Sequence, residues 1–106
     1  SPPLHEVVLF HCQQAAEKSL KALLAWHDIP FRKTHSLEEL GRPCIEIDAS
    51  LTDIIARAAP LTEYAWKFRY PGEPDVPSHD EAMAAMAIAR EVYAAVAARL
   101  PDSVRL

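Results

Sequence analysis

Apolar residues recur at intervals of three and four along three stretches of this 106-residue chain. This spacing places them on one side of an α-helix, whereas a half-buried strand would alternate at every second residue. The chain also contains 18 alanines but only two glycines, and no Asn-Gly or Asp-Gly pair that would turn a hairpin. Together these features predict an all-α protein.

The first stretch covers residues 4–27 and is predicted to be one long helix, which Pro30 ends. The side chains expected on its apolar stripe are Leu9, Cys12, Ala16, Leu20, Leu23 and His27. The polar residues fall largely outside that stripe: Gln13, Gln14, Glu17, Lys18 and Lys21. Glu17 precedes Lys21 by four residues, the order that favours a helical ion pair.

A short helix is predicted next. Ser36 and Glu39 form a capping box, in which the Ser36 hydroxyl accepts a hydrogen bond from the Glu39 backbone N–H. Gly41 and Pro43 are expected to end this helix. We interpret residues 44–48 as a packed loop or an irregular helical turn.

Two further helices complete the prediction. The helix over residues 50–69 begins with Ser50 and Asp53 as an N-cap pair, and Pro60 within it predicts a kink or two helices in sequence. Its apolar seam is Leu51, Ile54, Ala58, Leu61, Ala65 and Phe68. The last helix follows a Pro- and Gly-rich break at residues 70–77, begins with a second capping box and stops at Pro101. Its stripe is Ala82, Met86, Ala89, Tyr93, Val96 and Leu100.

These elements predict an up-and-down antiparallel helical bundle of three long helices and one short helix, in a single domain spanning residues 1–106. The longest apolar runs are far below membrane-spanning length, and the N-terminus carries no secretion signal. Cys12 and Cys44 are 32 positions apart, which is not the spacing of a zinc or redox pair. We therefore expect two buried, reduced thiols in a cytoplasmic protein.

The net charge of −4 argues against nucleic-acid binding through bulk positive charge. Residues 1–35 carry a net charge of +1 and residues 36–80 a net charge of −5, so any anion site must be local. The candidate cations are Lys18, Lys21, Arg32, Lys33, Lys67 and Arg69. The alternative for each of them is a solvated surface charge.

The five histidines contain no His-x3-His pair, so the spacing predicts no metal site, and no cofactor is expected. His35 is the best placed of them, because it follows the cationic run Arg32-Lys33 and precedes a helix N-terminus. The partial positive charge at that end of a helix favours an anion. The structural alternative is that His35 only hydrogen-bonds to the end of the bundle.

The run from Phe10 to Leu24, with Gln13-Gln14-Ala15-Ala16-Glu17-Lys18 at its centre, resembles the signature helix of the HEPN domain family (higher eukaryote and prokaryote nucleotide-binding). Arg69-Tyr70-Pro71 is similar to that family's Arg-Tyr-Pro motif, and the likeness extends from Phe10 to about Leu100. The resemblance implies a helical bundle that dimerises and a link to nucleotides or RNA. It also implies association with a small nucleotidyltransferase, often as a toxin–antitoxin pair.

Many members of the family begin with a further helix, whereas this chain has nine residues before Phe10. The family's first helix is therefore either absent from this chain or shortened in it. Its loss would expose an apolar face that a second copy of the chain could cover.

The family also contains metal-independent ribonucleases, whose motif is an Arg, usually followed by a polar residue, then four to six residues, then a His. Nine residues separate Arg69 from His79, and two separate Arg32 from His35, so neither pair matches. His35 and Arg69 would have to converge in space for the Arg to stabilise charge while the His moves a proton. The resemblance thus leaves a ribonuclease with Arg69, His35 and His79 as the enzymatic alternative.

We take a non-catalytic nucleotide- or RNA-binding module as the leading hypothesis, with Arg69, Tyr70, His35, Lys18 and Lys21 as its binding residues. An Arg followed by an aromatic residue at a helix end can hold a phosphate and stack a base. The alternative is that Arg69 contacts its own helix's last carbonyls while Tyr70 packs on the bundle. A third hypothesis is a purely structural interaction module.

Overall fold

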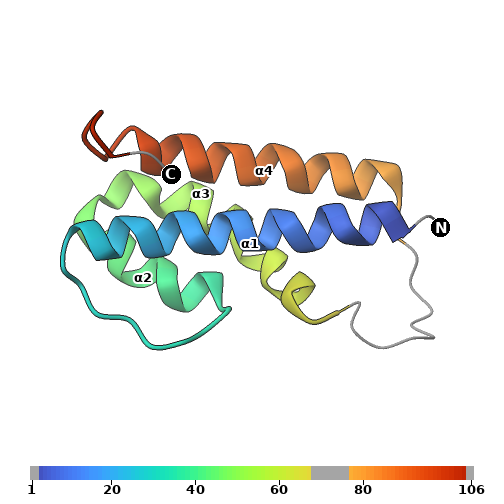
Figure 1. Cartoon of the computed structure of the whole chain (residues 1–106), viewed down its shortest axis with the longest axis horizontal. Coiled ribbons are helices and arrows are strands. Elements are labelled where there is room, and N and C mark those ends of the chain that lie inside the picture. Colours follow the sequence, from blue (N-terminus) through green and yellow to red (C-terminus); the bar gives the residue numbers. More distant parts are fainter. Residues whose placement is uncertain (1–2, 68–76, 105–106) are drawn as a thin grey trace.

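The computed structural model describes residues 3–67 and 77–104, and within these ranges every regular element is helical (Figure 1). The α-helices are α1 (Pro3–Trp26), α2 (Leu37–Ile47), α3 (Thr52–Ala58) and α4 (His79–Ala97). Two 3-10 helices, η1 (Ala49–Leu51) and η2 (Ala59–Ala65), flank α3. The all-α fold class is confirmed.

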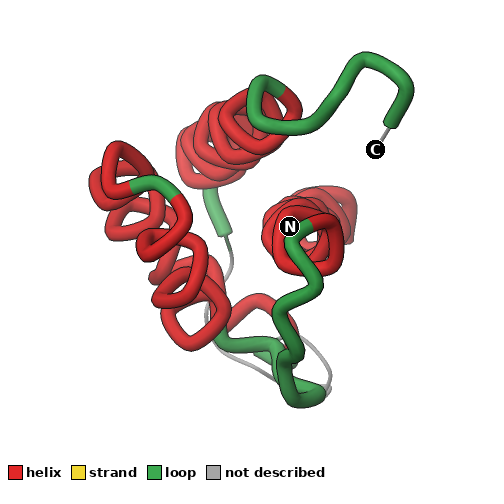
Figure 2. The backbone as a smooth tube through the Cα atoms, turned by 90° about the vertical axis from the view of Figure 1, so that its left-hand side faces the viewer, coloured by secondary structure: helices red, strands yellow, loops and turns green. Residues whose placement is uncertain are grey.

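The two longest helices, α1 and α4, lie side by side and run in the same direction (Figure 1). The segment formed by α3 and η2 runs back in the opposite direction, so the three long parts of the bundle alternate up, down and up. The short helix α2 lies along α1 and runs parallel to it, because the loop of residues 27–36 returns to the middle of α1 before α2 begins. Seen along its length, the bundle places α1, α4 and the α2–α3 layer around one core (Figure 2).

The first helix ends where the backbone of Asp28 takes a left-handed conformation, with φ of 57°. The Ile29 N–H donates to the Leu24 carbonyl at 2.9 Å, and the Asp28 N–H donates to the Ala25 carbonyl at 3.1 Å. This is the hydrogen-bond pattern of a Schellman motif. The helix therefore ends just before this motif rather than at Pro30, and His27, which was expected on the apolar stripe, is exposed.

The predicted end of the second helix is wrong. The Ser36 cap forms as expected, with the Glu39 N–H donating to the Ser36 hydroxyl at 3.1 Å, but α2 continues through Gly41 and Pro43 to Ile47. Gly41 serves close packing: a Cβ added there would lie 2.4 Å from Cγ2 of Ile55 on α3. Residues 44–47 are thus regular helix, not loop, and Cys44 is fully buried.

Pro60 divides the third long segment into α3 and η2, which confirms the expectation of two helices in sequence. It sits in the first turn of η2, where its missing N–H costs little. The expected N-cap pair of Ser50 and Asp53 does not form. Instead the Asp48 carboxylate caps η1 by accepting from the Ser50 backbone N–H at 2.9 Å.

The stripe predicted for α4 is partly wrong. Ser78 caps the helix by accepting from the Glu81 N–H at 3.0 Å, as expected. However, Tyr93 is 46% exposed, and Val92, at 1%, occupies the core instead. The buried positions of α4 are mostly alanines and valines (Ala82, Ala85, Ala89, Val92 and Val96), and such small side chains allow close approach to α1.

The apolar seam of residues 51–65 is buried as predicted, and Phe68 lies outside the described residues. Cys12 and Cys44 are both buried and free, as expected. Within the described ranges, no helix combines the length and the apolar character needed to cross a bilayer.

Candidate functional site

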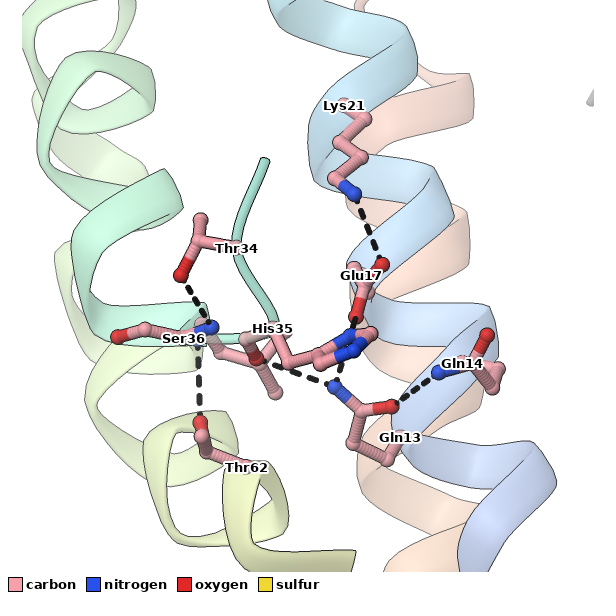
Figure 3. A network of polar contacts seen from close by, with 9 residues as sticks. Gln13, Gln14, Glu17, Lys21, Thr34, His35, Ser36 and Thr62 are labelled. Atoms are coloured by element: carbon pink, nitrogen blue, oxygen red, sulfur yellow. Dashed lines mark hydrogen bonds and ion pairs between the residues drawn. The ribbon is translucent and has the colours of Figure 1, made fainter. Parts of the chain in front are cut away.

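Two polar side chains of α1 are buried against the loop that follows it. Gln13 has no exposed surface and Glu17 retains 4% of its surface, although both were predicted off the apolar stripe. They are four residues apart and lie on the same side of the helix, facing residues 34–36 (Figure 3). Buried amides and carboxylates require hydrogen-bond partners, and these two find them in the loop and in each other.

The Glu17 carboxylate joins three groups. It accepts from Lys21 Nζ at 2.9 Å and from Gln13 Nε2 at 3.0 Å, and its Oε1 atom lies 2.8 Å from Nδ1 of His35. Burial by itself raises the pKa of Glu17, but the hydrogen bonds from these three groups outweigh it and lower the pKa below the ordinary value. Glu17 is therefore a buried anion at neutral pH, and the predicted Glu17–Lys21 ion pair is confirmed.

The Gln13 side chain binds the backbone of the loop. Its Nε2 atom donates to the His35 carbonyl at 3.1 Å as well as to Glu17, and its Oε1 atom accepts from Gln14 Nε2 at 2.6 Å (Figure 3). Within the described ranges, every buried side-chain nitrogen and oxygen has a partner. His35 is therefore held at two points: Gln13 binds its backbone carbonyl, and Glu17 binds its ring.

The N-terminus of α2 is closed by hydroxyl groups. The Ser36 N–H donates to Thr34 Oγ1 at 3.1 Å, and the Leu37 N–H donates to Thr62 Oγ1 at 3.0 Å. Together with the Ser36 cap on Glu39, these bonds occupy three backbone donors at the start of α2, the helix end where an anion was expected. An anion near His35 would therefore be held by side chains rather than by the end of the helix.

Arg32 is already paired. Its Nε and one terminal nitrogen donate to the two carboxylate oxygens of Glu39 at 2.5 and 2.7 Å. The hydrogen bonds from Arg32 lower the pKa of Glu39. This bidentate pair ties the loop to α2.

A family model of the HEPN domain matches residues 4–100 of the chain. The chain belongs to the HEPN domain family. This family comprises nucleotide-binding and ribonuclease-type modules, so the resemblance carried by the Gln-Gln-Ala-Ala-Glu-Lys run identified the family correctly. No curated protein and no solved structure matches the chain.

In this HEPN domain, the structure brings together two of the predicted site residues. His35 and Lys21 meet through Glu17, and the His35 side chain is 47% exposed beside it. Lys18 directly follows Glu17 on α1 and is exposed, and among the described residues it forms no ion pair. These three side chains lie on the second half of α1 and the loop that follows.

Another predicted residue lies elsewhere. His79 begins α4, and its ring lies 5.8 Å from that of His5, centroid to centroid. His5 precedes Glu17 by twelve residues, about 18 Å along the axis of α1. His79 and His35 therefore lie near opposite halves of α1. Arg69 and Tyr70 are outside the described residues, so the predicted convergence of Arg69 with His35 stays a prediction.

Sequence reasoning missed Gln13 and Glu17 as members of the site. One signal was available: a Gln and a Glu four residues apart on the helix, followed by a loop that ends in Thr-His-Ser. Polar side chains that share a helix face with nearby apolar ones can be buried when a loop supplies their partners.

Proposed function

We propose that this HEPN domain is a nucleotide- or RNA-binding module whose binding residues are His35, Lys18, Lys21, Arg69 and Tyr70. The single observation that carries the proposal is the family match over residues 4–100. The arrangement of α1 supports it, because the half-exposed His35 imidazole and Lys21 both contact Glu17, and Lys18 is exposed on the same helix.

The distribution of charge also supports phosphate binding by this part of the chain. Residues 1–35 have a net positive charge although the whole chain carries −4, and their four cations lie at Lys18, Lys21, Arg32 and Lys33. Arg32 is bound to Glu39, but Lys18 and Lys33 are exposed and form no ion pair among the described residues. Phosphate groups bind to such local clusters of cations even on an acidic protein.

Fluorescence anisotropy with a labelled oligoribonucleotide tests this proposal. Replacing Lys18 or Lys33 with Ala should weaken binding and lower the salt dependence by about one ion each. Arg69→Ala should weaken binding further. Arg42→Ala is the matched control, because Arg42 is an exposed cation paired with Glu38 on α2. Equal RNA binding by all these variants would show that Lys18, Lys33 and Arg69 are not part of the binding site.

We infer that the domain works as a homodimer with a small nucleotidyltransferase as its partner, in a toxin–antitoxin-like pair. This part rests on the family resemblance alone. Co-expression with the product of the neighbouring gene, followed by size-exclusion chromatography with light scattering, tests both associations. Recovery of a stable complex combined with no nucleotide or RNA binding would favour the purely structural interaction module instead.

The second candidate function is a metal-independent ribonuclease, and the contact between Glu17 and His35 favours it. A carboxylate that accepts from Nδ1–H orients the imidazole and leaves Nε2 to move a proton. RNA cleavage in the presence of a chelator, lost in His35→Ala and reduced with an altered pH profile in Glu17→Gln, would support this function. His79→Ala tests separately whether His79 takes part in cleavage. Intact RNA after prolonged incubation with the wild type would count against catalysis.

A further inference from the structure

A concave surface lies near the N-terminus of α1, between that helix and the end of η2. We call it the aromatic groove, and its volume is about 240 Å³. Its lining residues are Glu6, Val7, Phe10 and His11 from α1, and Tyr64, Ala65 and Trp66 from the other wall. Three of the seven are Phe, Tyr or Trp, in a chain in which only 8% of residues are of these types, and His11 adds a fourth ring.

The aromatic rings of the groove come from two parts of the chain, α1 and residues 64–66. The rings of Phe10 and His11 lie 5.6 Å apart, centroid to centroid, at 70°. Opposite them, Trp66 is 49% exposed although its side chain is large and apolar. Tyr64, which also lines the groove, is buried, and its hydroxyl donates to Glu81 at 2.5 Å, which holds its ring in place. A flat ring that entered the groove would cover surface that water now contacts.

The charged groups of the groove narrow the class of ligand. Glu6 supplies the one carboxylate among the described lining residues, and it can accept N–H donors from the edge of a bound ring. Nζ of Lys67 lies 5.8 Å from the centroid of the Tyr64 ring and 3.5 Å from Oε1 of Glu63, with which it forms an ion pair. A ligand that matches this lining has a planar aromatic body and N–H donors on one edge.

The size of the groove agrees with this chemistry. Sites for drug-sized ligands usually occupy about 300–1,000 Å³. A volume of about 240 Å³ is smaller and suits a single ring system. Aliphatic ligands would fill the groove but would use neither the stacking surface of Trp66 nor the carboxylate of Glu6.

We propose that the aromatic groove binds a guanine base of a nucleotide or RNA, stacked on Trp66 with its Watson–Crick edge on Glu6. This inference rests on the proposed nucleotide-binding function and gives it a second, base-reading site. Guanine carries two adjacent donors, N1–H and the N2 amino group, that fit the two oxygens of one carboxylate. Adenine and cytosine offer that carboxylate only their amino group.

Phe10 precedes Glu17 by seven residues, about 10 Å along α1. One RNA strand could therefore occupy the aromatic groove with a base while its backbone passes Lys18 and His35.

The two tryptophans provide a matched test, because each is 49% exposed but they lie far apart. Trp26 ends α1, whereas Trp66 lines the groove near the start of that helix. In Trp26→Phe the remaining fluorescence comes from Trp66, and in Trp66→Phe it comes from Trp26. GMP should quench Trp66 saturably and more tightly than AMP or CMP, while ribose 5-phosphate should leave it unchanged. Trp26 should respond only weakly and without saturation. Equal quenching of both tryptophans would indicate collisions and overturn the proposal.

Calorimetry with two variants tests the two contacts separately. Trp66→Ala should weaken GMP binding about tenfold, since one stacked base contributes that order of affinity. Glu6→Gln should remove most of the preference for GMP over AMP, because an amide accepts through one oxygen only. If both variants bind GMP as the wild type does while RNA binding persists, the groove is wrong and the proposed function stands. If the wild type binds neither nucleotides nor RNA, both fail.

Discussion

Nδ1 of His35 lies 2.8 Å from Oε1 of Glu17, although the two residues are 18 positions apart. The contact joins the loop of residues 27–36 to the middle of α1 (Figure 3). It places a half-exposed imidazole against a buried carboxylate, and the binding and the ribonuclease hypotheses both depend on this arrangement.

Removing the Glu17 carboxylate should destabilise the fold. Glu17→Ala leaves Lys21 and the His35 ring without their acceptor and creates a gap beside Gln13, so we expect a loss of about 1–3 kcal/mol in the free energy of unfolding. Urea denaturation followed by circular dichroism measures it. Glu46→Ala on the exposed face of α2 is the control and should cost much less. Equal losses in the two variants would show that the contact does not stabilise the fold.

Stability should fall in acid. The pKa of Glu17 is lowered below its ordinary value of 4.5, and hydrogen bonds from Ser50 and Arg99 lower the pKa of Asp48 from 3.8 to about 2. For a lowered pKa the unfolded chain binds more protons, so the stabilisation is present above the ordinary values and is lost below them. The free energy of unfolding should therefore decrease from about pH 4.5 towards pH 2. Glu17→Gln should flatten the upper part of this decrease, and an unchanged slope would contradict the assignment.

Gly41→Ala should destabilise the packing of α2 on α3. Alanine gains about 1 kcal/mol of helix propensity over glycine. However, its Cβ would lie 2.4 Å from Cγ2 of Ile55, a buried β-branched residue that cannot rotate away freely. We expect a net loss of about 1–2 kcal/mol. In a double-mutant cycle, Ile55→Ala should relieve this loss, and additive effects would show that the two residues do not clash.

Both thiols should be unreactive in the folded protein. Burial raises the pKa of Cys44 to about 11 and also raises that of Cys12, where nearby Arg90 only partly opposes it. Because the thiolate is the reactive form, labelling with a disulfide reagent at pH 8 should be slow and should follow the rate of unfolding. Rapid labelling of one thiol per chain would contradict the burial, and guanidinium-unfolded protein provides the fully reactive reference.

The sequence predicted the helices best where the helix signals agreed with one another. The capping residues Ser36 and Ser78 and the break at Pro60 act locally, so they needed no knowledge of tertiary contacts. The end of α2 was missed because Gly41 is there for a contact with α3, a reason that is not local. On α4, Tyr93 was predicted to be buried where Val92 is, for another reason. Alanine is only weakly hydrophobic, so the apolar side of an Ala-rich helix can be assigned in more than one register.

The candidate site was predicted in part. His35 was singled out from its place before a helix, and Lys21 was expected to pair with Glu17. Burial of Gln13 and Glu17 could not be read from periodicity, because it depends on the loop returning over α1. The aromatic groove was missed for the same reason, since residues 6–11 and 64–66 meet only in the folded chain.

The most direct test of nucleotide binding by this domain is an NMR titration of the isotope-labelled protein with a short guanine-containing oligoribonucleotide. We predict saturable shifts at His35, Lys18 and Lys21 and at the indole N–H of Trp66, with little change at the indole N–H of Trp26. A spectrum that stays unchanged at millimolar RNA, or shifts confined to the outer face of α4 around Tyr93, would contradict the account.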